Sequence, residues 1–387
     1  MPALTKCMAL MEQIAGAVVM LVTLLDIFLT VLYARAGTSL FSPFVSRAIW
    51  MVFRGASRPL GRNRGKALSF CGPVILVALI FVWAVGLALG STLIMHPHLG
   101  GGIRASQGST PRDFMSAFYA AANSLSFVGS SDFKPQPGAF QALYMLNSLI
   151  GMSVMSLVLT YVMQIYNALK SRNALGLGIQ TLSDDTGDAA ELIVGLGPHG
   201  QFDSGFSNLS NLASSVAEVK ESHHFYPLLF YFRFAEPYYS VSQTATVLFD
   251  SVSLLKSALS DEDYGWLKES ATVAQCWRAA MLLVSMLEEV FLPGHGAQVR
   301  SPDAGDRQRW RTRYMAALER MRQAGIKTIA DPEAGFGTYV SLRERWDGHI
   351  ARLRAAMLYD ADEIDAPTYR PEVVDARPPF GHRLHGV

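Results

Sequence analysis

The feature that most constrains this chain is a long uncharged stretch. No Asp, Glu, Lys or Arg occurs between positions 135 and 169. A bilayer core is about 30 Å thick, so a spanning helix needs about 20 predominantly apolar residues. Residues 14–34 and 67–95 are also apolar over a comparable length. The sequence therefore predicts three membrane-spanning helices, all of them before Lys170.

A short helix and a polar segment, neither long enough to span a bilayer, precede the third span. Phe114–Leu125 reads as a short apolar helix, and residues 126–132 follow as a run of small and polar residues. Pro135 and Pro137 end any helix at this point. Non-helical backbone at membrane depth is tolerated only where it is buried in protein or lines a water-filled path. The layout predicts a re-entrant pore loop; the alternative is an ordinary extracellular loop.

These residues resemble the pore module of tetrameric potassium channels, over residues 67–172. The family's filter reads Thr-Val-Gly-Tyr-Gly-Asp, and Val128, Gly129 and Asp132 match it. Many members also carry a glycine at the bend of the inner helix, and Gly151 stands at the corresponding spacing after Ser131. The resemblance implies that Phe114–Leu125 is the pore helix. The corresponding filter here is Ser126, Phe127, Val128, Gly129, Ser130, Ser131 and Asp132.

The resemblance also implies roles for residues around the filter. Asn123 and Ser124 belong to the pore helix, while Asn147, Gly151 and Ser153 line the inner vestibule. A ring of Asp132 carboxylates would concentrate cations at the outer mouth. One pore loop cannot surround an ion, so several chains must meet on a closed axis, and the family implies four. The permeant ion would be a monovalent cation such as K⁺, and no cofactor is implied. We expect the C-terminal helical domain to gate or regulate the pore.

Three filter positions depart from the family. Phe127 replaces a Thr whose hydroxyl helps form the innermost ion site, and Ser130 replaces the aromatic residue that braces the filter. Ser131 replaces a Gly, at a cost of about 1 kcal/mol if the backbone is left-handed there. Potassium selectivity depends on rings of backbone carbonyls. The alternative function is therefore a non-selective or non-conducting channel-fold protein, kept as a membrane sensor or scaffold.

The first span contains an acidic residue. A cleaved signal peptide is the alternative to a spanning helix at residues 14–34, but it would have a shorter apolar core and a small-residue cleavage site. Glu12 precedes the stretch where a signal peptide has basic residues, which favours a retained helix. An intramembrane carboxylate is costly and indicates a function for Asp26. The alternative is that Asp26 pairs with Arg35 or Arg47 near the cytoplasmic end.

Basic residues set the predicted topology. Residues 35–66 carry Arg and Lys but no Asp or Glu, which places this connection in the cytoplasm. Residues 44–54 mix aromatic side chains with arginines, as in a helix that lies in the interface against anionic lipid. The loop with His96 and His98 is then outside, where the histidines are solvated, bind a metal or sense pH. The N-terminus is outside and the C-terminal domain is cytoplasmic, in the inner (plasma) membrane that the resemblance implies.

The sequence beyond Lys170 changes character. After the N-terminal segment 1–66 and the pore module 67–172, we predict a linker at 173–200, a helical cytosolic domain at 201–359 and a flexible tail at 360–387. Gly195, Gly197 and Gly200 fit the G-x-G-x-x-G pattern of dinucleotide-binding folds. No alternating strand–helix series follows them, so we interpret these glycines as a loop.

Hydrophobic spacing predicts the helices of the C-terminal domain, from residue 207 onward and at 240–259, 261–292, 306–325 and 339–359. Asp261 is the predicted N-cap of its helix. The aromatic run 223–234 is a buried core, a subunit interface or a surface against the bilayer, with the first two favoured. The later helices are rich in arginine, which predicts a solvated face; the residues are Arg307, Arg309, Arg311, Arg313, Arg320 and Arg322.

Composition excludes several functions. A net charge of +1 gives no indication of nucleic-acid binding. Cys7, Cys71 and Cys276 are far apart and odd in number, so they form neither a disulfide framework nor a metal-binding pair. No nucleophile elbow, zinc spacing or Walker loop occurs, and we predict that the chain is not an enzyme. The predicted fold class is an all-α membrane protein, with an extra N-terminal spanning helix, an outer helix–pore loop–inner helix module and an α-helical cytosolic domain.

Overall fold

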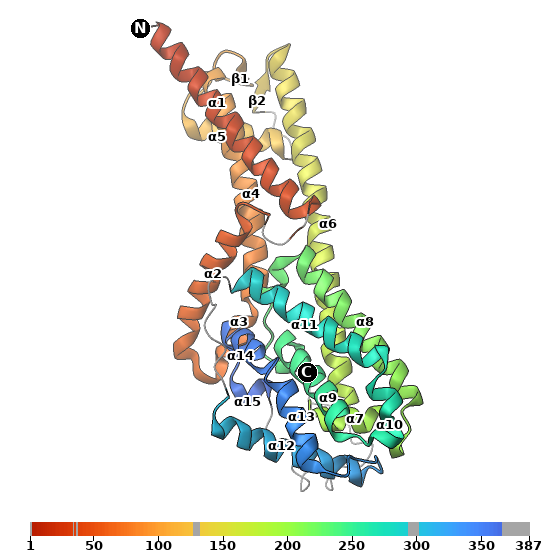
Figure 1. Cartoon of the computed structure of the whole chain (residues 1–387). Helices are drawn as coiled ribbons and strands as arrows, with labels where there is room; N and C mark the ends of the chain where they lie inside the picture. The colour runs from red at the N-terminus through yellow and green to blue at the C-terminus, as the bar shows by residue number, and fades with distance from the viewer. Residues whose placement is uncertain (1, 34, 36–37, 127–131, 293–301, 366–387) are drawn as a thin grey trace, which may run out of the picture. The chain divides into compact units, whose positions relative to one another are not determined.

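The computed structural model describes residues 2–33, 35, 38–126, 132–292 and 302–365 (Figure 1). The chain is predominantly helical and divides into two compact units. The first unit comprises Met1–Leu169 and His223–Arg233, and the second comprises Lys170–Ser222 and Phe234–Val387. Three helices are long and apolar enough to cross a membrane, over Lys6–Leu32, Arg64–His98 and Ala139–Leu182. This agrees with the predicted number of spans.

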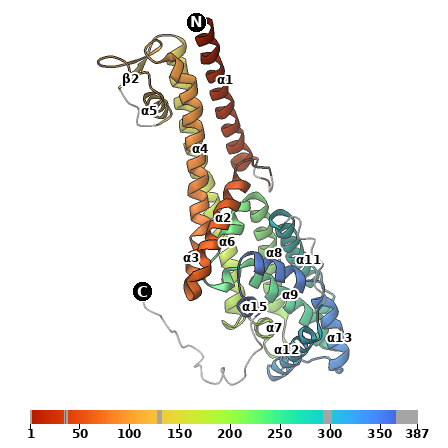
Figure 2. The ribbon, with the colours of Figure 1, turned by 90° about the vertical axis from the view of Figure 1, so that its left-hand side faces the viewer.

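The first unit is built on two helices that lie side by side. α1 (Pro2–Ile27) continues into a π-helical turn, η1 (Phe28–Leu32), and packs along α4 (Cys71–Met95), as Figure 2 shows. Glycines allow the close approach: a Cβ on Gly16 would lie 2.6 Å from the Gly90 carbonyl oxygen. Small residues are the usual means by which spanning helices come into contact. The other elements are α2 (Ser42–Ser57), η2 (Arg58–Asn63), α3 (Arg64–Ser69), η3 (His96–His98), β1 (Ile103–Ala105), α5 (Phe114–Leu125), β2 (Phe133–Pro135) and α6 (Ala139–Leu182).

The predicted linker at 173–200 is wrong. α6 runs unbroken to Leu182, and α7 (Ala189–Leu196) follows after a short turn. Gly176 is a contact point rather than a flexible position, because a Cβ there would lie 2.3 Å from the Tyr238 carbonyl oxygen. The apolar run before Gly197 belongs to helix α7, so the strand that a dinucleotide fingerprint requires is a helix here. Gly197 caps that helix and η4 (Pro198–Gly200) follows.

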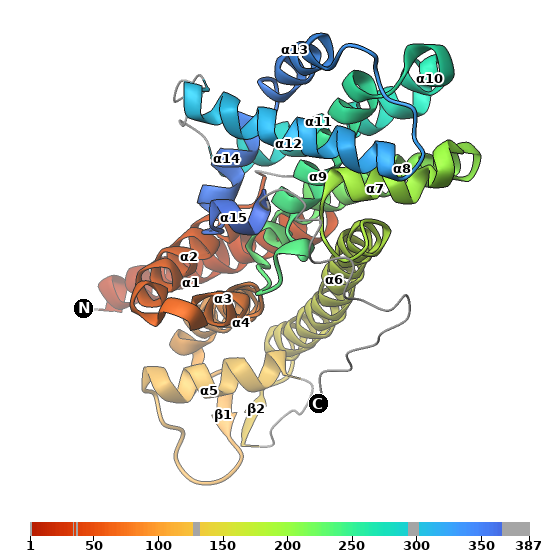
Figure 3. The same ribbon diagram turned by 90° about the horizontal axis from the view of Figure 1, so that it is seen from below.

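The second unit surrounds one buried helix. α9 (Val241–Ala258) is buried along almost its whole length, against α7, α11 (Ala271–Phe291), α13 (Pro332–Arg343) and α14 (Asp347–Ala356) (Figure 3). Leu248, Phe249 and Leu255 form the centre of this core. The remaining helices of this unit are α8 (Asp203–Phe225), of which residues 223–225 belong to the first unit, η6 (Pro237–Tyr239), α10 (Asp261–Lys268), α12 (Ala304–Gln323) and α15 (Ala361–Ile364). η5 (Pro227–Tyr231) belongs to the first unit.

Short breaks divide helices that the apolar spacing predicted as continuous. The predicted helix 261–292 is split, because the Ser270 side chain accepts the Val273 N–H and starts α11. α10 and α11 are bent by 54°, and together they are apolar enough to count as a fourth candidate span. Ser260, not Asp261, is the N-cap of α10. The predicted helix 339–359 is likewise divided into α13 and α14.

The aromatic run is buried in the first unit. η5 lies in this run, and Leu228, Leu229 and Phe232 are almost fully buried. The rings of Tyr231 and Trp50 are 6.0 Å apart. A Cβ on Gly72 would lie 2.6 Å from the Phe232 ring, so α4 needs a glycine at this point. Of the three interpretations, the buried core is therefore confirmed.

Two predictions about charged residues are wrong. Asp360 was placed at the start of a flexible tail, yet it caps α15, and Asp365 after it pairs with Arg313 and Arg343. Arg313 was expected on a solvated face, but its side chain is 9 % exposed and bonds to the fully buried Asp250. A buried guanidinium is stable only where carboxylates compensate for its lost hydration, and Asp250 and Asp365 both bond to Arg313 here.

Candidate pore module

α5 begins near the C-terminal end of α4. Asp113 is its N-cap, and the side chain accepts hydrogen bonds from Ser116 N at 2.9 Å and Ser116 Oγ at 2.8 Å. Those hydrogen bonds hold the pKa of the Asp113 carboxyl below its usual range. The Phe114 ring lies 5.9 Å from the ring of His96, which follows the last residue of α4. The capped start of α5 is thus fixed beside the loop between α4 and β1.

The other end of α5 contacts the first third of α6. A Cβ on Gly151 would lie only 1.9 Å from the Leu125 carbonyl oxygen. Gly151 is about 18 Å along α6 from Ala139, at about 1.5 Å of rise per residue. A bilayer core is about 30 Å thick, so this contact is near mid-depth if α6 spans from its start. The sequence placed Gly151 at a bend of the inner helix; here it is the point at which α5 meets α6.

A buried polar cluster joins the three helices of the module. Asn147 Nδ2 donates to Ser91 Oγ on α4 at 2.8 Å and to Ser124 Oγ on α5 at 2.9 Å. Asn147 is 1 % exposed, so it cannot line an open vestibule, and that prediction is wrong. Ser124 donates in turn to the Ala121 carbonyl. Asn123, the residue before Ser124, is half-buried. Through its two hydrogen bonds, Asn147 on α6 connects α5 to both α4 and α6.

After the candidate filter the chain returns to the region just beyond the C-terminal end of α4. Phe127, Val128, Gly129, Ser130 and Ser131 lie outside the described residues. Asp132 is described, and its carbonyl accepts from Ser106 N at 2.8 Å while its carboxylate accepts from Tyr119 OH at 2.7 Å.

A short sheet then fixes the returning strand. β2 pairs antiparallel with β1, with Arg104 opposite Lys134. Beneath the sheet, a small core of Met95, Leu99, Ile103, Ala117 and Ala121 joins α4 to α5. Both ends of the excursion from residue 113 to residue 133 are thus held at one end of α4.

One face of α6 is open within the single chain and carries polar side chains. The polar stripe consists of Ser153, Ser156, Thr160, Gln164 and Asn167, all exposed. Their spacing of three or four residues places them on one side of the helix. Only 11 % of the apolar window of this helix is buried, far less than in the other two candidate spans. Ser153 is the one predicted vestibule residue that lies on this open face.

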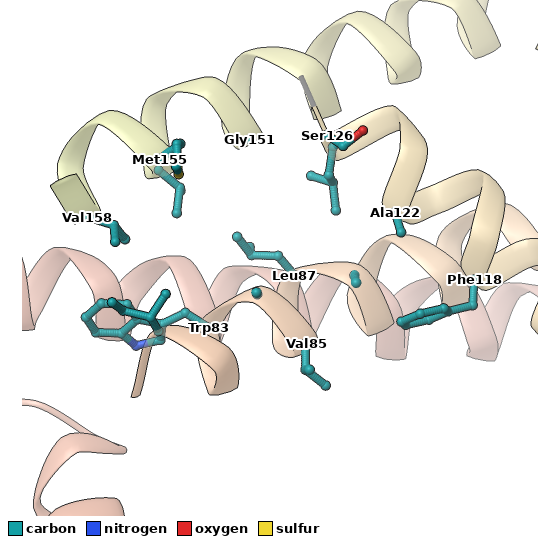
Figure 4. Close-up of a pocket in the computed structure, with 14 residues that line it drawn as sticks. Trp83, Val85, Leu87, Phe118, Ala122, Ser126, Gly151, Met155 and Val158 are labelled. Carbon is teal, nitrogen blue, oxygen red and sulfur yellow. The ribbon is translucent and has the colours of Figure 1, made fainter. Parts of the chain in front are cut away.

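An apolar cavity of about 370 Å³ lies between α4, α5 and α6. Trp83 and Leu87 of α4, Phe118 of α5 and Met155 of α6 point into it (Figure 4). Ser126 and Gly151 close the end nearest the candidate filter. Its walls offer almost no polar group, so the cavity has no means of holding a hydrated ion.

Asp26 is fully buried at the C-terminal end of α1. Its carboxylate accepts from the backbone N–H groups of Leu40 at 2.6 Å and Phe41 at 2.9 Å, just before α2. It also accepts from Trp83 Nε1 on α4 at 2.7 Å. Across the described residues no ion pair of Asp26 occurs, so the expected pairing with Arg35 or Arg47 is not observed. Asp26 instead ties α1, α4 and the start of α2 together.

Removing the Asp26 carboxylate should weaken this junction. In Asp26→Ala, the N–H groups of Leu40, Phe41 and Trp83 lose their acceptor, and a buried donor left unpaired costs about 1–3 kcal/mol. We expect a clearly lower melting temperature of the full-length protein in detergent, with a smaller decrease in Trp83→Phe, which removes one donor. Equal melting temperatures for Asp26→Ala and the unaltered protein would contradict the role of this carboxylate.

The two histidines of η3 are not simply solvated. His96 Nδ1 lies 2.7 Å from Glu12 Oε1, and His98 Nε2 lies 2.8 Å from Gln13 Nε2. The N-terminal half of α1 is thereby joined to η3. Within the described part of the chain, no three His, Cys, Asp or Glu side chains gather closely enough to hold a metal ion.

Sequence reasoning missed three elements of this module. The β1–β2 pair is too short to leave a periodic signal. The contacts of Asn147 with Ser91 and of Trp83 with Asp26 join residues more than 50 positions apart. A signal for Asn147 exists in retrospect, because an amide in an uncharged spanning helix requires a polar partner. No family model, characterised relative or solved structure matches the chain.

Proposed function

We propose that the chain is one subunit of a cation-conducting pore, assembled from four copies of itself around a central axis. The observation that carries the proposal is the path of residues 113–133, which leave the end of α4, reach α6 and return. α5 starts beside His96, ends against Gly151, and the chain then returns to pair with β1. The sequence predicts a polar, non-helical connection after Ser126, and such backbone at membrane depth is tolerated only beside water or inside protein.

The charges at the two ends of the excursion favour cations. The carbonyl end of α5 carries partial negative charge from the helix dipole, directed toward Ser126 and the residues after it. Asp132 supplies a full negative charge at the outer side, and four copies would form an acidic ring. The filter that we propose comprises residues 126–132, with backbone carbonyls as ion ligands.

The polar stripe of α6 supplies the inner part of the pathway. Exposed hydroxyl and amide groups on a spanning helix are costly against lipid but favourable against water or a neighbouring helix. Four symmetry-related copies of α6 would turn Ser153, Ser156 and Thr160 toward a shared axis. Basic residues 35–66 then face the cytoplasm, together with the second unit, in a plasma membrane.

A second function is favoured by the filter sequence. Phe127, Ser130 and Ser131 replace the Thr, Tyr and Gly on which potassium selectivity depends in the family that the module resembles. These substitutions favour a pore that is non-selective, or a non-conducting sensor or scaffold that keeps the channel architecture. Restoring the three family residues at these positions should then create or sharpen a preference for potassium over sodium.

Cysteine accessibility and ion flux together test the pore. In a chain with Cys7, Cys71 and Cys276 replaced by Ala, we expect Ser156→Cys to react with a membrane-impermeant thiosulfonate in liposomes and to lose cation flux on reaction. Thiolates form readily only in water. Phe81→Cys is the matched control, since Phe81 is 67 % exposed in the single chain but lies on α4, away from the proposed axis.

The outcomes separate the two functions. Labelling of Ser156→Cys with measurable potassium or sodium flux supports the conducting pore. Labelling without flux in any condition supports the non-conducting alternative. A Ser156→Cys that stays as unreactive as Phe81→Cys would mean that the stripe faces lipid or protein, and the pore proposal would fail.

A further inference from the structure

α2 has two distinct faces. Ser46 and Ser57 are buried and 11 positions apart, so they mark one side of the helix that packs inward. Phe44, Met51 and Val52 are 77 %, 66 % and 67 % exposed on the other side. An apolar outer face on a helix in a connecting segment needs an apolar environment to cover it.

Arginines border the exposed apolar face. Arg47, Arg54 and Arg58 are all exposed, and their spacing of seven and four residues forms one row beside Phe44 and Met51. The combination of an apolar strip and a flanking row of guanidinium groups is the pattern of a helix embedded at a membrane surface.

The charges in this row have no acidic partner in the part of the chain that the structure describes. No Asp or Glu occurs between Asp26 and Asp113 in the sequence. Arg47 bonds to the Tyr231 hydroxyl, which is neutral. The exposed arginines of α12 differ, because Arg307 pairs with Glu344 and Arg309 pairs with Asp306. The arginines of α2 thus need a negative charge that the described chain does not supply.

α2 is also held in position from behind. Asp26 accepts the N–H groups of Leu40 and Phe41 just before the helix, and the ring of Trp50 lies 6.0 Å from that of Tyr231. Both contacts are made within the first unit. A pre-positioned helix loses less conformational freedom on binding than a free amphipathic segment would.

We propose that the outer face of α2 binds the phosphate headgroups of anionic phospholipids. Arg54 and Arg58 contact the phosphate oxygens, and Phe44, Met51 and Val52 enter the acyl region beneath them. Guanidinium groups suit this ligand because they donate two parallel hydrogen bonds to a phosphate. This lipid site does not depend on whether the pore conducts ions.

Energy transfer from tryptophan to a pyrene-labelled lipid tests the site, because Trp50 lies on α2 itself. The full-length protein in neutral detergent would be titrated with labelled phosphatidylglycerol, in competition with unlabelled phosphatidylglycerol or phosphatidylcholine. We expect phosphatidylglycerol to compete far better than phosphatidylcholine. Arg54→Gln with Arg58→Gln should bind phosphatidylglycerol about 25-fold more weakly, at about fivefold for each basic residue near a headgroup layer.

Two matched variants make the result specific. Arg307→Gln with Arg309→Gln removes the same charge from α12 and should bind as the unaltered protein does. Arg54→Lys with Arg58→Lys keeps the charge and should retain most of the binding. Equal competition by the two lipids would overturn the proposal, as would undiminished binding in the α2 Gln variant or an equal loss in the α12 variant. Circular dichroism confirms that each variant keeps its helical content.

Discussion

Replacing Arg343 by Met is expected to destabilise the second unit by about 3–5 kcal/mol, the usual cost of breaking a buried ion pair from one side. Arg343 is 1 % exposed and its guanidinium lies between two indole rings, 5.3 Å from that of Trp310 and 4.8 Å from that of Trp346. It donates to Tyr339 OH at 2.8 Å and pairs with Asp250 and Asp365. Methionine fills the volume but leaves those carboxylates with less positive charge.

Among the partners of Arg343, we expect Asp250 at the centre of this network to be affected most. Asp250 is fully buried and retains only Arg313 at 2.7 Å and Tyr339 OH at 2.5 Å when Arg343 is removed. Tryptophan fluorescence during denaturant unfolding reports on the unit, because Trp310 and Trp346 flank the altered site.

Arg309→Met provides the control for this measurement. Arg309 is 75 % exposed and pairs with Asp306 on the surface, so we expect a change below about 1 kcal/mol. If Arg343→Met cost no more than Arg309→Met, the buried network would have no net role in stability.

Adding one methyl group at Gly151 should abolish ion flux. The new Cβ of Gly151→Ala would lie 1.9 Å from the Leu125 carbonyl oxygen, which belongs to backbone and cannot rotate away. α5 must then move away from α6, and Ser126 moves with it. Overpacking of this kind costs about 1–3 kcal/mol, and the displacement disturbs the start of the proposed filter. Liposome flux of potassium and sodium measures the effect.

Gly178→Ala is the matched control in the same helix. Nothing lies within 4 Å of a Cβ at Gly178, and alanine is favoured over glycine in a helix by about 0.5–1 kcal/mol. We therefore expect unchanged flux and equal or greater stability. Flux from Gly151→Ala equal to that of Gly178→Ala would show that the α5–α6 contact is not needed for conduction.

The sequence predicted the helices well because their signals are local. The uncharged stretches, the short helix at Phe114–Leu125 and the spacing of Val247 and Leu254 depend on residues within a few turns. The divisions at Ser270 and Trp346 were missed, because an apolar face continues across a short capped break. The end of α6 was missed because Asn173 and Gly176 have the composition of a linker, although α6 continues through them.

The candidate site was predictable only in part, because its contacts join distant positions. Gly151 was identified from its spacing, but only the structure shows that it meets Leu125. The burial of Arg313 and the pairing of Asp365 could not be predicted, since nothing in composition separates a buried arginine from a solvated one. Asp26 was recognised as unusual, while its partners, two backbone N–H groups and an indole, carry no charge by which to find them.

The assignment of His223–Arg233 to the first unit has a consequence for inheritance. The segment covers Trp50 and Gly72, although the residues on both sides of it belong to the second unit. A truncation after Asn173 would strip that cover from the spanning helices. A recombination event with a single crossover near residue 170 would also separate this segment from the spanning helices that it covers. A gene fusion that replaced the second unit would therefore have to keep residues 223–233 with the first unit. The two halves are therefore expected to be inherited together rather than shuffled as independent modules.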